Sequence, residues 1–179
     1  NRMGGFIIAE VARKLKEEKI KLPFGLYIVN SVQEEIGLRG AQMIAERIKP
    51  DVAIINDVCH DTNTPMINKI EQGDFKSGDG PVLSYAPAVQ NNLLKLLIDT
   101  AKKKKIPFQR MALSSRTGTD TDAFAYSNEG VASALISLPL KYMHTTVETA
   151  HRDDVENLIK LYIEVLQNIK DGHDFRYIK

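Results

Sequence analysis

The sequence predicts an α/β protein, a three-layer αβα sandwich with a mostly parallel mixed sheet. Apolar runs rich in strand formers alternate with amphipathic stretches of helical period along most of the 179 residues. This alternation is typical of a sheet that is covered by helices on both faces. No internal repeat, linker or low-complexity tract interrupts the pattern, so we expect one domain over residues 1–179.

The first half of the chain is expected to contain two helices and three strands. Ile7, Val11 and Leu15 recur at helical spacing, which predicts an amphipathic helix over residues 5–18. Residues 24–32 are apolar and rich in strand formers, which predicts a buried strand. The remaining elements expected here are a helix over 41–48 that Pro50 ends, a strand over 52–55 and a third strand over 66–70.

The second half begins with a loop over residues 73–81 that is rich in Gly and Asp. Leu93, Leu97 and Ala101 share one side of a clear helix over 91–105. The remaining expected elements are strands over 108–113 and 131–138, a polar loop over 114–122, and a last helix over 153–169.

Composition is ordinary for a globular protein, with 43% hydrophobic and 26% charged residues. The net charge of +1 gives no indication of a nucleic-acid groove. The single cysteine, Cys59, can form no internal disulfide, which favours a reducing cytoplasm. No apolar stretch approaches the ~20 residues that span a bilayer. We therefore expect a cytoplasmic protein without nucleic-acid or membrane partners.

Two adjacent glutamates, Glu34 and Glu35, directly follow the strand expected over 24–32. Adjacent carboxylates repel each other, and the pKa of one of them is usually raised. A chain tolerates this arrangement when a cation lies between the carboxylates or when each has its own task. The pair therefore suggests one metal ligand and one general base.

Asp57 and His144 follow two other predicted strands. Functional groups gather at the carboxyl ends of strands in sheets of this kind, so these side chains are expected near the glutamate pair. Carboxylate oxygens and an imidazole nitrogen suit zinc, cobalt or manganese. Each residue alone has an ordinary structural explanation, but together they favour a metal site.

Other residues compete for the same roles. His60 and Asp61 lie near Asp57 and form an alternative pair of metal ligands. Asp120 and Asp122 open a short helix, where capping is the ordinary explanation. Asp120 could also support the site or contact substrate.

A nucleophilic mechanism has little support in the sequence. There is no Gly-x-Ser-x-Gly motif, and Cys59 and His60 are neighbours in sequence that seldom point at each other on a strand. His151 and His173 are expected in solvent.

Residues 32–41, Val-Gln-Glu-Glu-Ile-Gly-Leu-Arg-Gly-Ala, resemble the signature of the co-catalytic metallo-aminopeptidases. This is the tetrahedral or glutamyl aminopeptidase-like family, once also named endoglucanases. Five further segments resemble the family in the same order, namely 57–65, 78–81, 106–109, 118–120 and 139–148. Lys141 stands where the family usually has Arg.

The resemblance implies a zinc-peptidase-like fold and a hydrolase that removes N-terminal residues from peptide substrates. It implies two divalent metal ions, zinc or cobalt with manganese as an alternative, that activate a water molecule. Glu34 would be the general base, Glu35 would bind one metal, and Asp57 would bind the other. His144 would complete the coordination of the metal held by Glu35.

The resemblance also implies missing parts. In the family, a bridging aspartate precedes an Asn-Arg pair that Asn1 and Arg2 resemble, and a further histidine ligand and a dimerisation insertion lie upstream. We therefore expect the chain to be the C-terminal portion of a catalytic domain. This portion alone should be inactive and bind metal weakly. The full-length protein should be a homo-oligomer based on dimers, up to a dodecamer.

Two alternative functions stay open. A glycoside hydrolase would use two carboxylates ~5–9 Å apart across a sugar ring. Adjacent glutamates at a strand end suit a metal and a water molecule better. The second alternative is an inactive fragment or scaffold.

Overall fold

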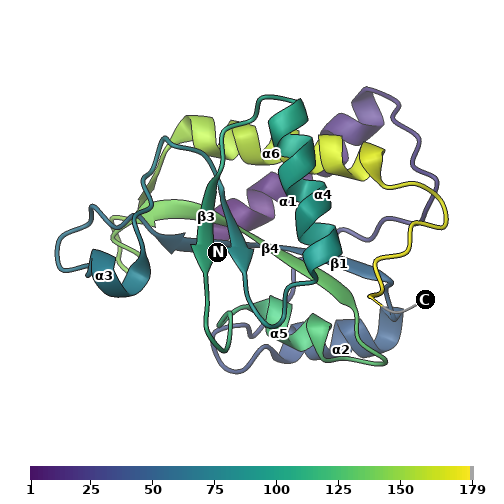
Figure 1. Ribbon diagram of the computed structural model, residues 1–179, viewed down its shortest axis with the longest axis horizontal. Helices are drawn as coiled ribbons and strands as arrows, with labels where there is room; N and C mark the ends of the chain where they lie inside the picture. Colours follow the sequence, from purple (N-terminus) through teal and green to yellow (C-terminus); the bar gives the residue numbers. More distant parts are fainter. Residues whose placement is uncertain (178–179) are drawn as a thin grey trace.

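A five-stranded mixed sheet lies between two layers of helices in the computed structural model, which describes residues 1–177 (Figure 1). Its strands are β1 (Val52–His60), β2 (Val82–Tyr85), β3 (Gln109–Ala112), β4 (Ala132–Lys141) and β5 (Thr149–Ala150). The order is β1-β4-β2-β3, and β5 pairs with β4. The β1–β4 and β2–β3 pairs are parallel, whereas β2 and β5 run antiparallel to β4. The predicted α/β class is confirmed.

Helices cover both faces of the sheet (Figure 1). One layer holds α1 (Arg2–Glu17), α4 (Asn91–Lys103) and α6 (Arg152–Asn168), and the other holds α2 (Arg39–Ile48) and α5 (Asp120–Ala125). The short α3 (Lys69–Gln72) lies to one side. No helix within residues 1–177 is long and apolar enough to cross a membrane.

The helical periodicity of the sequence accounts for the core. Ile7 and Val11 of α1, Leu97 of α4 and Leu158 of α6 are buried in one core cluster with Leu135 of β4, which is 1% exposed. Burying such a side chain contributes about 1.5–3 kcal/mol. The helices predicted over 5–18, 41–48, 91–105 and 153–169 are thereby confirmed, with ends that differ by a few residues.

The buried strand predicted over 24–32 is wrong. This segment is irregular, and Tyr27 and Val32 are 68% and 66% exposed. Strand formers need a neighbouring strand edge to pair with, and within residues 1–177 no strand pairs with this segment. The strand predicted over 66–70 is also wrong, because Met66 and Ile70 lie in solvent and Asn68 caps α3.

Two strands extend further than predicted. β1 continues to His60, so Asp57 lies inside the strand and not after its end. β4 continues through Pro139 to Lys141. Proline has no N–H to donate to a neighbouring strand. The pairing of β4 with β2 ends at Ser137, so no hydrogen-bond donor is needed on the β2 side of Pro139. The short strands β2 and β5 were not predicted.

Candidate metal centre

Glu34 and Glu35 lie in a tight turn that leads into α2. The N–H groups of Gly37 and Leu38 donate to the Glu34 carbonyl oxygen at 3.1 and 3.0 Å. Gln33 and Leu38, on either side of this turn, have left-handed φ values of 61° and 57°. Such conformations are costly for residues other than glycine and cluster at functional sites. The turn thus holds both carboxylates on a defined backbone.

His144 lies in the loop after β4 and also has a left-handed backbone, with φ of 61°. Its N–H donates to Glu148 Oε1 at 2.7 Å, which orders the loop. The imidazole Nε2 lies 3.6 Å from Glu35 Oε1, and the two side chains are 69% and 70% exposed. The structure therefore brings together two of the residues that the sequence marks as ligands.

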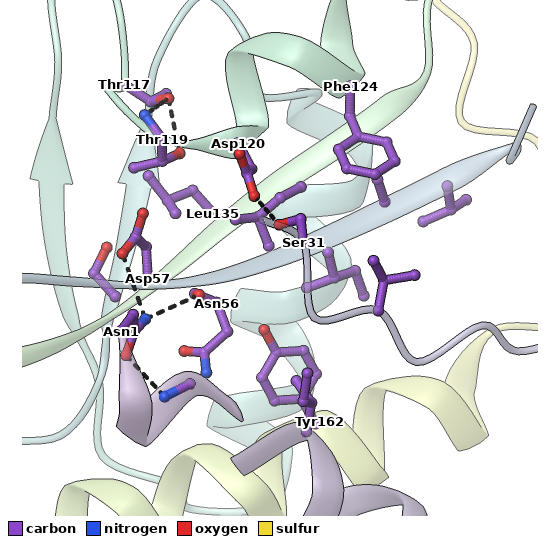
Figure 2. A pocket seen from close by; sticks show the side chains of 18 of the residues that line it. Asn1, Ser31, Asn56, Asp57, Thr117, Thr119, Asp120, Phe124, Leu135 and Tyr162 are labelled. Carbon is purple, nitrogen blue, oxygen red and sulfur yellow. Dashed lines mark hydrogen bonds between the residues drawn. The ribbon is translucent and has the colours of Figure 1, made fainter. Parts of the chain in front are cut away.

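Asp57 occupies a separate position within β1, where it is in register with Ser137 of β4. Its Oδ1 accepts hydrogen bonds from the Val58 N–H at 2.8 Å and from Asn1 Nδ2 at 3.4 Å (Figure 2). Burial raises the pKa of the Asp57 carboxyl, and the nearby charge of Asp120 raises it further. Within residues 1–177, no hydrogen bond or ion pair joins Asp57 to Glu35 or His144.

Glu34 connects the two positions electrostatically. Burial raises the pKa of the Glu34 carboxyl to about 7, and the charges of Asp57, Glu35 and Asp120 raise it in the same direction. These four acidic side chains line one hollow of about 3880 Å³, which His144 also lines. A carboxyl that titrates near neutral pH is suited to proton transfer.

The donor chemistry fits a divalent cation, but the donor set is incomplete. Carboxylates with an imidazole suit zinc and its neighbours. Within residues 1–177, no Lys or Arg side chain forms an ion pair with Glu34 or Asp57, and the pKa values of both carboxyls are raised. However, residues 1–177 contain no group of three or more His, Cys, Asp or Glu side chains placed to hold a metal ion. Glu35 and His144 are a pair of donors, and Asp57 stands apart from them.

The alternative pair, His60 and Asp61, is less suited to metal binding. Asp61 is 1% exposed, and its two oxygens accept the N–H groups of Asn63 at 2.7 Å and Ser77 at 3.1 Å. Lys141 approaches Asp61 at 4.0 Å. The Asp61 carboxylate therefore stabilises the loop between β1 and β2.

The acidic residues of α5 have different roles from those expected. Thr119, not an aspartate, caps the helix. Asp122 accepts the N–H groups of Thr117 and Gly118 at 3.1 Å and closes the preceding turn. Asp120 accepts a hydrogen bond from the Ser31 hydroxyl (Figure 2). Ser31 carried no signal in the sequence that marks it for this site, whereas Asn1, which contacts Asp57, was marked only through the resemblance of Asn1 and Arg2 to the Asn-Arg pair of the family.

The remaining candidates have structural explanations. His151 caps α6 by accepting the Asp153 N–H at 3.3 Å, and His173 stacks on Phe175 with ring centres 4.5 Å apart. Cys59 is buried, and burial raises the pKa of its thiol to about 12. A thiol with that pKa is a poor nucleophile.

Comparisons with known proteins agree with this fold and these motifs. Residues 1–161 match the M42 glutamyl aminopeptidase family. The lysyl aminopeptidase of Pyrococcus furiosus is 39% identical over 165 residues, which are 92% of this chain and 46% of that protein. The TET aminopeptidase from the marine sediment archaeon Thaumarchaeota archaeon SCGC AB-539-E09 has a TM-score of 0.87 at 33% identity, over 94% of this chain and 48% of that one. The Pyrococcus horikoshii TET1 peptidase, which can assemble into a tetrahedron or a large octahedral shell, has a TM-score of 0.71 at 26% identity, over 93% and 47% of the two chains.

This chain belongs to the M42 glutamyl aminopeptidase family, a family of metal-dependent hydrolases. It spans about half the length of the curated relatives that it matches: 46% of the Pyrococcus furiosus protein and 49% of a putative aminopeptidase of Acetivibrio thermocellus. The fold of residues 1–177 corresponds to about half of each related structure.

Proposed function

We propose that this chain supplies part of the active site of a binuclear metal-dependent aminopeptidase, which removes N-terminal residues from peptides. The observation that carries the proposal is the contact of His144 with Glu35, beside a glutamate whose carboxyl has a pKa of about 7. Family membership supports the same reaction class.

In this proposal, Glu35 and His144 hold one ion, and Asp57 contributes to the second. When bound, two divalent ions, zinc or cobalt with manganese as an alternative, would supply Lewis-acid polarisation of a carbonyl and make a water molecule more acidic. The metal ligands that are missing from residues 1–177 would come from the part of the complete polypeptide that corresponds to the uncovered half of the relatives. The chain by itself should therefore bind metal weakly and lack activity.

Glu34 would move the proton. A carboxyl with a pKa of about 7 is partly ionised at neutral pH, so it can accept a proton from water and later deliver it to the leaving amine. The acidic cluster of Glu34, Glu35, Asp57 and Asp120 would attract the positively charged amino terminus of a peptide. This attraction explains why cleavage would be restricted to the first residue.

The assembly of the complete protein is a further part of the proposal. The Pyrococcus horikoshii relative assembles into large closed shells, and we propose a homo-oligomer based on dimers, up to a dodecamer, for the protein that contains this chain. Light scattering of the complete polypeptide tests this point, and a monomer would contradict it.

The activity is tested on the complete polypeptide with three substrates: a peptide with a free amino terminus, the same peptide acetylated there, and a soluble β-glucan. We expect hydrolysis of the free peptide alone, loss of that activity in EDTA, and recovery with zinc or cobalt. Hydrolysis of the β-glucan that survives EDTA would support a glycoside hydrolase instead. Absence of hydrolysis after metal is supplied would favour an inactive scaffold.

A further inference from the structure

The segment that leads to Glu34 has little to hold it. Residues 21–32 have no regular secondary structure and lie mostly in solvent. The two sides of the glutamate turn are tied to each other, because the Gly40 N–H donates to the Val32 carbonyl oxygen at 3.1 Å. A Cβ at Gly40 would lie 2.4 Å from that oxygen, so the turn is tightly closed on α2. The turn and the start of α2 thus form one unit, and the segment that approaches it, residues 21–31, needs contacts of its own.

Leu22 and Phe24 pack against the core, and one hydrogen bond holds the later part of this segment. Ser31 lies three residues before Glu34, and its hydroxyl donates to Asp120 Oδ2 (Figure 2). Among the residues that the structure describes, it is the only hydrogen bond from residues 21–31 to another part of the chain. This bond links the residues just before the Glu34 turn to α5, and α5 packs on the sheet.

The acceptor is itself held firmly. Thr119 Oγ1 accepts the Thr121 N–H at 3.2 Å, and Asp122 ties down Thr117 and Gly118. These bonds surround Asp120 and fix the start of α5, which packs on β1 and β4. The other carboxylate oxygen, Asp120 Oδ1, is buried without a hydrogen-bond partner within residues 1–177. Burying a carboxylate oxygen without a hydrogen-bond partner costs free energy, so its presence here suggests a functional reason.

We propose that Asp120 is a positioning residue for the reaction: through the Ser31 hydroxyl it fixes the turn that carries Glu34. This inference rests on the proposed function, in which Glu34 transfers the proton. Asp120 acts through Ser31 and needs no contact with the reacting atoms. A displacement of about 1 Å at a reacting group can lower a rate about 100-fold. Loss of the Ser31–Asp120 hydrogen bond, which we call the brace, should therefore lower kcat and leave KM nearly unchanged.

Amide hydrogen exchange of the complete polypeptide tests the brace without any need for activity. Ser31→Ala and Asp120→Ala should accelerate exchange of the Gly37 to Gly40 amides about tenfold, because these amides close the turn. Ser31→Thr keeps a hydroxyl donor and Asp120→Asn keeps an acceptor, so both should exchange as the wild type does. The matched control is Ser115→Ala, because Ser115 is exposed and makes no hydrogen bond within residues 1–177. Exchange in Ser31→Ala within twofold of the wild type would overturn the brace.

Kinetics test the consequence for the reaction. For Ser31→Ala, we expect kcat to fall about 10–100-fold with KM within twofold, and Ser31→Thr to restore most of the turnover. An unchanged kcat in Ser31→Ala, or a loss that Ser31→Thr does not restore, would overturn the positioning role. If the wild type hydrolyses no peptide, the proposed function fails, and the exchange experiment still decides whether Asp120 holds the turn.

Discussion

The imidazole of His144 lies 3.6 Å from the carboxylate of Glu35, although the two residues belong to loops that are far apart in the sequence. Both side chains are about 70% exposed, and an ion pair in that setting contributes little to stability. Two explanations of the contact are a contribution to folding and the shared metal ion that we propose.

The first prediction separates these two explanations. In the complete polypeptide without metal, His144→Ala should have the same melting temperature as the wild type, because an exposed pair adds little. With zinc, the wild type should gain thermal stability, because metal that binds the folded state shifts the equilibrium. Zinc affinity of His144→Ala should fall at least about tenfold.

The matched control for this experiment is His173→Ala, which removes an imidazole that stacks on Phe175 away from Glu35. It should bind zinc as the wild type does. Equal zinc affinity of His144→Ala and the wild type, measured by calorimetry, would remove His144 from the metal site.

The second prediction concerns the pH dependence of stability. The pKa of the Glu34 carboxyl is raised by burial from 4.5 to about 7 in the folded state. The folded state therefore favours the protonated carboxyl, and this contribution is present in full below pH 4.5 and is lost as pH rises to about 7. Between these values the unfolded chain binds fewer protons, so the free energy of unfolding should fall as pH rises.

Glu34→Gln provides the control for the pH experiment, because glutamine does not titrate. In metal-free protein, melting temperatures measured from pH 4.5 to 7.5 should decline less steeply for Glu34→Gln than for the wild type. Parallel curves for the two proteins would show that the Glu34 carboxyl titrates at its ordinary pKa.

The third prediction concerns Asp154 at the start of α6. Its carboxylate is fully buried and accepts the N–H groups of Gly78 at 2.7 Å and Gly80 at 2.8 Å. Asp154→Ala should destabilise the fold by about 1–3 kcal/mol for each donor left unpaired. The neighbouring Asp153→Ala, whose side chain is exposed, should change stability by less than about 0.5 kcal/mol. Urea unfolding of both variants measures the difference, and equal midpoints would show that Asp154 does not hold this loop.

Local periodicity was enough to predict the four longer helices, because side chains such as Leu97 and Leu158 repeat on one face and are buried there, whereas the short α3 buries no residue and was missed. The prediction of a strand over 24–32 was wrong because it used composition alone. A strand also needs a partner strand to pair with, and composition does not reveal one. β2 was missed because it has only four residues, at Val82–Tyr85, between two prolines.

The candidate site was predicted in part. Glu35 and His144 come together as expected, although Glu35 follows an irregular segment and not the strand end that the prediction assumed. Within residues 1–177, no hydrogen bond or ion pair joins Asp57 to them, and its role as a metal ligand stays a prediction. The link between Ser31 and Asp120 depends on tertiary structure, and no pattern in the sequence announces a contact between such distant residues.

The most direct test of the account is the Glu34→Gln variant of the complete polypeptide, with metal content and peptide hydrolysis measured on the same sample. We predict that the variant keeps the metal content of the wild type and loses at least about 100-fold in kcat, because an amide cannot accept the proton of water. Peptide hydrolysis at the wild-type rate by metal-loaded Glu34→Gln would contradict the assignment of Glu34 as the base.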